Sequence, residues 1–211
     1  VSFVAGPVAF QEEETHYEKA QSLEFISLIA SGAGAIGAKQ AFICNGANLA
    51  FRKLIYAEVD TDKASGDDVF LLHHAKKNGS KIVFVKDQEA IVFTSPKEDL
   101  YSLLQQRKRW AAKSSDYQDK DAKRISWIVF LSNFCLLLLL FLGTWREIFI
   151  AFVLKAIIDY SFLKKAVIFF QKEHIFRYFY PLQIFYPFYI VYVAVASQMG
   201  GFKWKGRKHK K

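Results

Sequence analysis

Hydrophobic residues are distributed unevenly between the two parts of the chain, and the second part is dominated by long apolar segments. Residues 125–142 are eighteen consecutive positions without a charge, about the length of a helix that crosses a bilayer. A second apolar segment, residues 148–163, contains Lys155 and Asp159. Because these two lie one helical turn apart, we expect them to pair with each other.

A third apolar segment covers residues 176–199 and differs from the other two in its first half. That half is crowded with Phe and Tyr and contains Pro181 and Pro187. Aromatic rings prefer the headgroup level of a membrane, so we expect only the second half to be embedded in lipid. The sequence therefore predicts two to three hydrophobic helices in residues 125–201, followed by a basic tail at residues 202–211.

In residues 1–124 short apolar runs alternate with amphipathic stretches, which predicts an α/β domain. The first predicted helix, from Gln11 to Ala30, either is buried in the domain or lies at the membrane interface. Ser95-Pro96-Lys97-Glu98 combines a capping box with proline at the first helical position, and so predicts a helix start. The other predicted elements are strands at residues 1–5, 41–44, 82–85 and 90–94 and a helix at residues 69–78 that ends at Gly79.

Three glycines, Gly32, Gly34 and Gly37, have the spacing G-x-G-x-x-G. A dinucleotide site needs that spacing between a strand and a helix, because the phosphate then meets a helix N-terminus. Here it follows a predicted helix, so the sequence predicts a small-residue loop and no dinucleotide site.

The basic charge of the chain lies in its apolar part. Residues 1–124 carry 17 Lys and Arg against 17 Asp and Glu, whereas residues 125–211 carry 12 against 3 and hold the whole net charge of +9. This distribution is typical of juxtamembrane charge that faces anionic lipid. A nucleic-acid partner would need the excess on the soluble part, and it is not expected.

The cysteine and histidine pattern indicates no metal site. The two cysteines, Cys44 and Cys135, form no Cys-x-x-Cys pair. The adjacent His73 and His74 point about 100° apart on a helix, which makes a poor chelate.

A cluster of possible substrate contacts lies at Gln106, Arg109 and Trp110, which spell Q-x-x-R-W. The spacings i, i+3 and i+4 place an amide, a guanidinium and an indole on one helix surface. Such groups suit a diphosphate and a sugar ring. The alternative is an Arg and a Trp that anchor the domain at the membrane.

An acidic pair, Asp67-Asp68, lies upstream at the start of a predicted helix. A positioned carboxylate can take the proton of a hydroxyl nucleophile in the transition state. The alternative is that these residues only cap the helix.

Four motifs in this order resemble the membrane-bound family 2 glycosyltransferases, the group that contains cellulose and hyaluronan synthases and ceramide glucosyltransferase. The motifs are Asn45 to Arg52 (N-G-A-N-L-A-F-R), Gly66-Asp67-Asp68, Gln106 to Trp110, and the hydrophobic anchor. The resemblance implies an α/β fold, the C-terminal part of a GT-A-like (Rossmann-like) catalytic domain followed by transmembrane or interfacial helices. The predicted domains are residues 1–124, 125–201 and 202–211.

The resemblance also implies an activity and roles for single residues. The activity is inverting transfer of a sugar from a nucleotide-sugar donor, such as a UDP-sugar, to a lipid or glycan hydroxyl. Asp68 matches the general base of a T-E-D-like motif, and Asp67 replaces the glutamate. The resemblance further implies that the substrate contacts are Gln106 and Arg109 near the diphosphate, Trp110 on a sugar ring, and Asn45 and Asn48 near the acceptor.

The family holds Mg²⁺ or Mn²⁺ on D-x-D carboxylates, which we expect to lie before residue 1. Asp60-Thr61-Asp62 matches the D-x-D pattern but follows the acceptor loop, so we do not assign metal binding to it. We therefore expect a C-terminal fragment that carries the acceptor side and the base, and that alone neither binds nor transfers a sugar.

Charge near the apolar segments predicts how the chain sits in a membrane. Lys113, Lys120, Lys123 and Arg124 place the catalytic part in the cytoplasm, as in a bacterial inner membrane. A cytoplasmic basic tail then requires that one segment fails to cross, and we expect this of the proline-containing third. The rival interpretation is a non-catalytic channel or transporter piece that uses Lys155 and Asp159.

Overall fold

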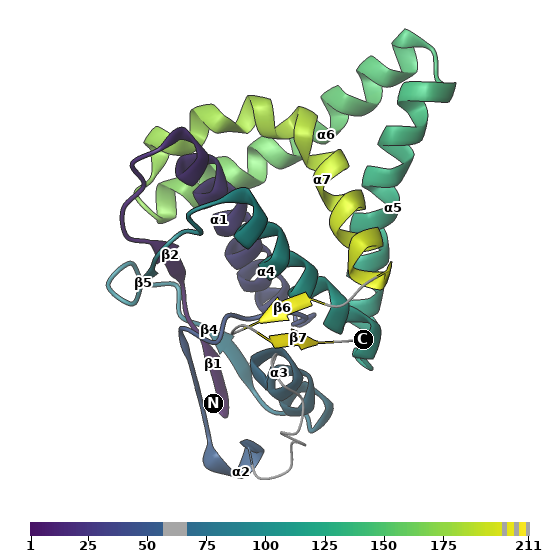
Figure 1. Ribbon diagram of the computed structural model, residues 1–211. Coiled ribbons are helices and arrows are strands. Elements are labelled where there is room, and N and C mark those ends of the chain that lie inside the picture. Colours follow the sequence, from purple (N-terminus) through teal and green to yellow (C-terminus); the bar gives the residue numbers. More distant parts are fainter. Residues whose placement is uncertain (57–66, 200–201, 205–206, 210–211) are drawn as a thin grey trace.

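The computed structural model describes residues 1–56, 67–199, 202–204 and 207–209 (Figure 1). Its strands are β1 (Phe3–Ala5), β2 (Val8–Phe10), β3 (Leu49–Phe51), β4 (Ile82–Phe84), β5 (Val92–Thr94), β6 (Phe202–Trp204) and β7 (Arg207–His209). Its α-helices are α1 (His16–Gly37), α2 (Lys53–Tyr56), α3 (Asp67–Lys77), α4 (Leu100–Ala112), α5 (Lys120–Leu142), α6 (Trp145–Phe169) and α7 (Phe179–Met199). Two 3₁₀ helices are η1 (Lys113–Asp116) and η2 (Glu173–Tyr178).

The first part of the chain is mixed α/β, and the described chain as a whole is mostly helical. One sheet has the order β3-β1-β4, in which β1 runs antiparallel to β3 and parallel to β4. A parallel pair, β2 with β5, continues beside it, and β6 pairs with β7 near the C-terminal end. Every described strand is three residues long, so the helices supply most of the framework.

Two clusters of buried side chains hold these elements together. The first, here called the sheet core, lies between β1, α3 and the end of α1. Its buried members are Phe3, Ala5, Ile36, Ala41, Ile55, Leu71, Leu72 and Ala75.

The second cluster, here called the junction core, joins the two parts of the chain. It contains residues of β2 and α1 together with Ala166, Val167, Phe170, Ile175, Phe176 and Phe179 from the end of α6 to the start of α7. A buried ion pair between Glu13 and Lys172 reinforces the joint. The predicted boundary at residue 124 falls inside α5, and the hydrophobic helices share a core with the first part.

Helix α1 is longer than the sequence predicted, and the loop expected at Gly32, Gly34 and Gly37 is wrong. The helix begins with a capping box between Thr15 and Glu18 and continues through all three glycines. A β-carbon at Gly32 would lie 2.9 Å from the backbone oxygen of Ile43, so the missing side chain permits a close approach. Tertiary packing therefore outweighs the low helix propensity of glycine.

Two other local predictions are also corrected. Residues 41–44 form no strand, because the carbonyls of Ala41 and Phe42 accept side-chain hydrogen bonds from α3. Helix α4 starts at Leu100, and its N-cap is Asp99, not the Ser95 capping box. The Asp99 carboxylate accepts from the amide of Ser102 at 2.7 Å.

Two described segments are long and apolar enough to cross a membrane, Lys120–Leu142 and Glu173–Met199. Only 11% and 17% of their most apolar stretches are buried in the protein, which is unlike the core helix of a soluble domain. Helix α6 is not a candidate membrane span, because charged residues interrupt its apolar sequence. Its Lys155 ammonium bonds Asp159 at 2.5 Å and Gln183 at 2.7 Å, which confirms the predicted local pair.

Helix α7 contains both prolines of the third apolar segment without a break. It continues through Pro187, which is buried. It packs along α4 and α5, and both of its ends meet the first part of the chain, since η2 packs on α1 and β6 contacts α4 (Figure 1). The distal ends of α5 and α6, in contrast, project away from the sheets (Figure 1).

Candidate active site

Asp68 lies in the first turn of α3, which the sheet core holds against β1. One of its carboxylate oxygens accepts from the amide of Gly46 and the other from the amide of Val69, both at 2.9 Å. These two backbone donors fix the direction of the carboxylate. A carboxylate has about four acceptor positions, so Asp68 can still accept a proton from a bound hydroxyl.

The loop from Asn45 to Asn48 wraps around this carboxylate. A β-carbon at Gly46 would lie 3.2 Å from an Asp68 oxygen, tighter than an ordinary contact, so glycine allows the approach. The Asn45 side chain accepts from the amide of Ala47 at 2.9 Å and shapes the turn.

Helix α4 brings Arg109 and Trp110 to the same place. Asp68, Asn45, Arg109 and Trp110 all line one cavity of about 250 Å³. The cavity is closed by apolar residues of α1 and by Phe84 of β4, and its remaining polar side chains come from Cys44, Lys113 and Tyr117.

Three of the predicted site residues do not line this cavity. Asp67 is exposed at the start of α3. The Gln106 side chain accepts from the Arg107 guanidinium at 2.6 Å. The Asn48 amide donates to the carbonyls of Pro7 and Ala90, both at 2.8 Å, and so joins the connection after β1 to the turn before β5.

Sequence reasoning missed Arg107, which lies inside the Q-x-x-R-W. Its guanidinium forms a buried two-point contact with Glu24 of α1, at 2.5 Å and 3.2 Å. Burial alone would lower the pKa of Arg107, but the Glu24 carboxylate more than offsets this, and the pKa is raised. The guanidinium also lies 4.4 Å from the centre of the Trp110 ring, so Arg107 fixes both Glu24 and the indole.

Lys113, Tyr117 and Cys44 add titratable groups that the motifs did not reveal. Burial, aided by the charge of Arg109, lowers the pKa of Lys113 to about 8, although Asp68 and Asp67 act in the opposite direction. Burial also lowers the pKa of Arg109, partly offset by Asp68. Burial and the charge of Asp68 raise the pKa values of Tyr117 and Cys44. The cavity thus combines one carboxylate with two partly desolvated cations.

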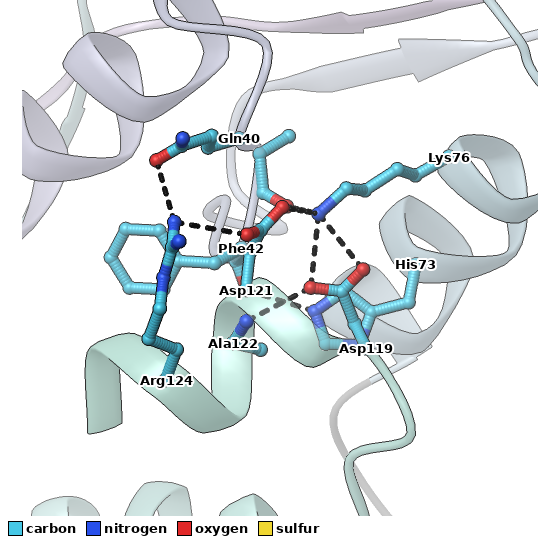
Figure 2. Close-up of polar contacts among 9 residues, drawn as sticks. Gln40, Phe42, His73, Lys76, Asp119, Asp121, Ala122 and Arg124 are labelled. Carbon is cyan, nitrogen blue, oxygen red and sulfur yellow. Dashed lines mark hydrogen bonds and ion pairs between the residues drawn. The ribbon is translucent and has the colours of Figure 1, made fainter. Parts of the chain in front are cut away.

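A polar cluster connects α3 to the start of α5 (Figure 2). Lys76 of α3 pairs with Asp119 and Asp121, both at 2.8 Å. The Asp119 carboxylate also caps α5 by accepting from the amide of Ala122 at 2.9 Å. Desolvation disfavours the charged forms of both groups, but their hydrogen bonds and opposite charges have the larger effect. The pKa of Lys76 is therefore raised and that of Asp119 is lowered. The helix that carries Asp68 is therefore tied to the first hydrophobic helix.

Among the described residues, no group of three or more His, Cys, Asp or Glu side chains could hold a metal ion. Asp60 and Asp62 lie outside the described residues.

Comparison with known proteins identifies the family of the chain. Residues 1–197 match the family model described as glycosyl transferase family group 2. No curated protein and no solved structure matches the chain. The match extends over α3, α4 and nearly all of the three hydrophobic helices. The chain therefore belongs to glycosyl transferase family group 2.

Proposed function

We propose that this protein is an inverting glycosyltransferase that moves a sugar from a nucleotide-sugar donor, such as a UDP-sugar, to a hydroxyl of a lipid or glycan, with Asp68 as the general base. Membership of the family supports glycosyl transfer in general. The observation that carries the finer proposal is that Asp68 shares one cavity with Arg109 and Trp110, which come from a motif 38 residues further along.

The base acts on the acceptor. Asp68 is held by the amides of Gly46 and Val69, so its free lone pairs face a fixed direction. An acceptor hydroxyl donates its proton to the carboxylate as its oxygen bonds to the anomeric carbon of the sugar. The bond from that carbon to the diphosphate breaks on the opposite face, which inverts the configuration. A positioned base of this kind supplies on the order of 10²–10⁴ in rate.

The cations act on the leaving group. Arg109 and Lys113 line the cavity and place positive charge where negative charge develops on the diphosphate. Trp110 presents an indole to the same space, and the Arg107 guanidinium holds the ring in place. Gln106 acts through its bond to Arg107 and belongs to this support. A bound Mg²⁺ or Mn²⁺, on carboxylates that we expect outside the described residues, would further neutralise the diphosphate.

The cavity suits part of the substrate. Its volume of about 250 Å³ is below the usual range of roughly 300–1,000 Å³ for pockets that enclose a whole ligand. It fits the acceptor end and one sugar ring, with Asn45 on the acceptor side.

Two helices long and apolar enough to cross a membrane support a location at a membrane. We propose a bacterial inner membrane with the catalytic part in the cytoplasm. Lys113, Lys120, Lys123 and Arg124 precede α5 on that side. The segments on either side of α7, η2 and β6, contact α1 and α4 of the first part of the chain, which supports a cytoplasmic basic tail. A transport role for Lys155 and Asp159 has no support, because they pair with each other and with Gln183.

The test is Asp68→Asn in the full-length protein, assayed in membranes by transfer of labelled sugar from UDP-sugars. We expect transfer to fall by about 10²–10⁴-fold while donor binding is retained. The matched control is Asp99→Asn, the same change at a helix N-terminus outside the cavity. Asparagine caps a helix about as well as aspartate, so this control should keep near wild-type transfer. Near wild-type transfer by Asp68→Asn would reject Asp68 as the base.

A further inference from the structure

A second and larger cavity lies between the C-terminal end of α1, β4 and the C-terminal end of α6. Its volume is about 890 Å³. It shares four wall residues with the candidate active site: Ile29, Ala33, Ile36 and Phe84. No part of the chemistry proposed above uses this cavity.

The polar side chains of this cavity are almost all cationic. Five lysines line it, and no Asp or Glu does so among the described residues: Lys39, Lys76, Lys81, Lys86 and Lys165. Lys76 is paired with Asp119 and Asp121. The other four are exposed and, within the described part of the chain, form no ion pair. The cavity therefore has a net positive rim that suits an anionic group.

The rest of the wall is apolar, and it continues along α6 toward the membrane. Phe162 and Phe169 of α6 line the cavity on either side of Lys165. Further back on the same helix face, Ile158 and Leu154 follow at intervals of four residues and are 68% and 57% exposed. An exposed apolar stripe thus leads from the part of α6 that projects away from the sheets to the ring of lysines.

Glycine keeps the floor of the cavity open. Gly34 and Gly37 of α1 line it, and an added β-carbon at either position would meet nothing within 4 Å. Gly32, in contrast, is packed against Ile43. The empty space at Gly34 and Gly37 is consequently available to a ligand.

We propose that this cavity binds an anionic phospholipid, with its phosphate headgroup among Lys39, Lys81, Lys86 and Lys165. Its acyl chains lie against Phe162 and Phe169 and along the α6 stripe. The combination of a cationic rim and a continuous apolar path from a hydrophobic helix selects a lipid over a soluble anion, which would use only the lysines. The bound lipid would touch the residues that also border the active-site cavity, Ile29, Ala33, Ile36 and Phe84.

The first test measures lipid retention by the full-length protein purified in mild detergent. Phosphatidylglycerol and phosphatidylcholine with the same acyl chains are offered together, and bound lipid is quantified by native mass spectrometry. We expect preferential retention of phosphatidylglycerol. Lys81→Gln with Lys165→Gln should weaken it by about five-fold for each lysine removed. The charge-matched control is Lys53→Gln with Lys77→Gln, two exposed lysines outside the cavity, which should retain wild-type preference.

The second test fills the space without removing a charge. Gly34→Phe should abolish retention of both lipids, and it should leave α1 helical because its β-carbon meets no neighbour; hydrogen exchange of α1 checks this. Equal retention of the two lipids, equal losses in the two lysine pairs, or full retention by a folded Gly34→Phe would each overturn the proposal. Because lipid retention is measured without sugar transfer, its outcome is independent of the role of Asp68.

Discussion

The two sides of the active-site cavity pack on two different hydrophobic cores, which take their residues from different parts of the chain. Asp68 stands on α3, and α3 packs on the sheet core, whose buried residues all lie between Phe3 and Ala75. Trp110 stands on α4 and packs on the junction core, which combines residues of β2 and α1 with residues 166–179. The carboxylate side is thus built within the first part of the chain, whereas the side with the cations and the indole depends on the hydrophobic helices.

This difference indicates how the site is assembled. Helix α4 packs along α7, and its Arg107 is paired with Glu24 beneath that helix. The Tyr189 hydroxyl of α7 lies 3.5 Å from the same carboxylate. We therefore expect Arg109 and Trp110 to reach Asp68 only when α7 is docked. Lipid or detergent that displaces α7 would disturb the leaving-group side first.

The largest expected effect comes from breaking the pair beneath α7 with Arg107→Met. Glu24 would then be a buried carboxylate without its partner, and removing one member of a buried ion pair costs about 3–5 kcal/mol. We expect loss of amide protection in α4, α7 and the middle of α1, while α3 keeps its protection. Hydrogen exchange followed by mass spectrometry, on protein in lipid nanodiscs, measures the four helices separately.

The control for this change is Lys108→Met, which alters the neighbouring charge in α4 and has no ion-pair partner among the described residues. It should leave all four helices protected. Adding Glu24→Leu to Arg107→Met should restore part of the protection, because an apolar pair replaces the unpaired carboxylate. Equal loss in α3 and α4 after Arg107→Met would show that the two cores do not open separately.

A somewhat smaller effect, confined to the other side, is expected from Leu72→Ala. Leu72 of α3 is fully buried in the sheet core, and such a truncation costs about 2–5 kcal/mol. Protection of α3 and β1 should fall while that of α4 and α7 is kept, the reverse of the Arg107 pattern. The exposed Leu54 in α2 provides the control, since Leu54→Ala removes the same atoms from a site 79% exposed. A Leu72→Ala protein that loosens α7 as much as α3 would contradict the comparison.

The same contrast explains how much could be predicted from the sequence. Helix α3 follows from its local pattern, as do its stop at Gly79, with a φ of 65°, and the pair Lys155–Asp159. The motifs predicted four residues that line the cavity: Asn45, Asp68, Arg109 and Trp110. All of these depend on residues close together in the chain or on an ordered series of motifs.

What could not be predicted depends on distant partners. In the sequence, Arg107 is one of three adjacent cations. No neighbouring residue indicates that it pairs with Glu24, which is 83 positions away. The helix through Gly32 is decided by its contact with Ile43, against the preference of glycine for a loop. The junction core could not be predicted because an apolar helix next to lipid and one next to protein have similar compositions.

The smallest expected effect concerns Lys113, a cation that lines the active-site cavity together with Asp68 and Arg109. Its pKa is about 8, because burial and the neighbouring Arg109 disfavour the charge. In the protein without substrate Lys113 is therefore cationic below about pH 8 and neutral above it. If its charge steadies the leaving diphosphate, kcat/KM for sugar transfer should fall as pH rises through 8. Because solvent still reaches the half-buried Lys113 and screens its charge, its ion pair with the leaving group should contribute about 1 kcal/mol, so the fall should be about five-fold.

Lys113→Arg separates this cause from others, because arginine keeps its charge over the whole range. The pH profile of kcat/KM should lose its fall near pH 8 in this variant, while Lys113→Met should have the lower rate at every pH. An alkaline fall that persists unchanged in Lys113→Arg would assign it to another group. A Lys113→Met enzyme with the wild-type rate and profile would show that Asp68 faces only one working cation, Arg109.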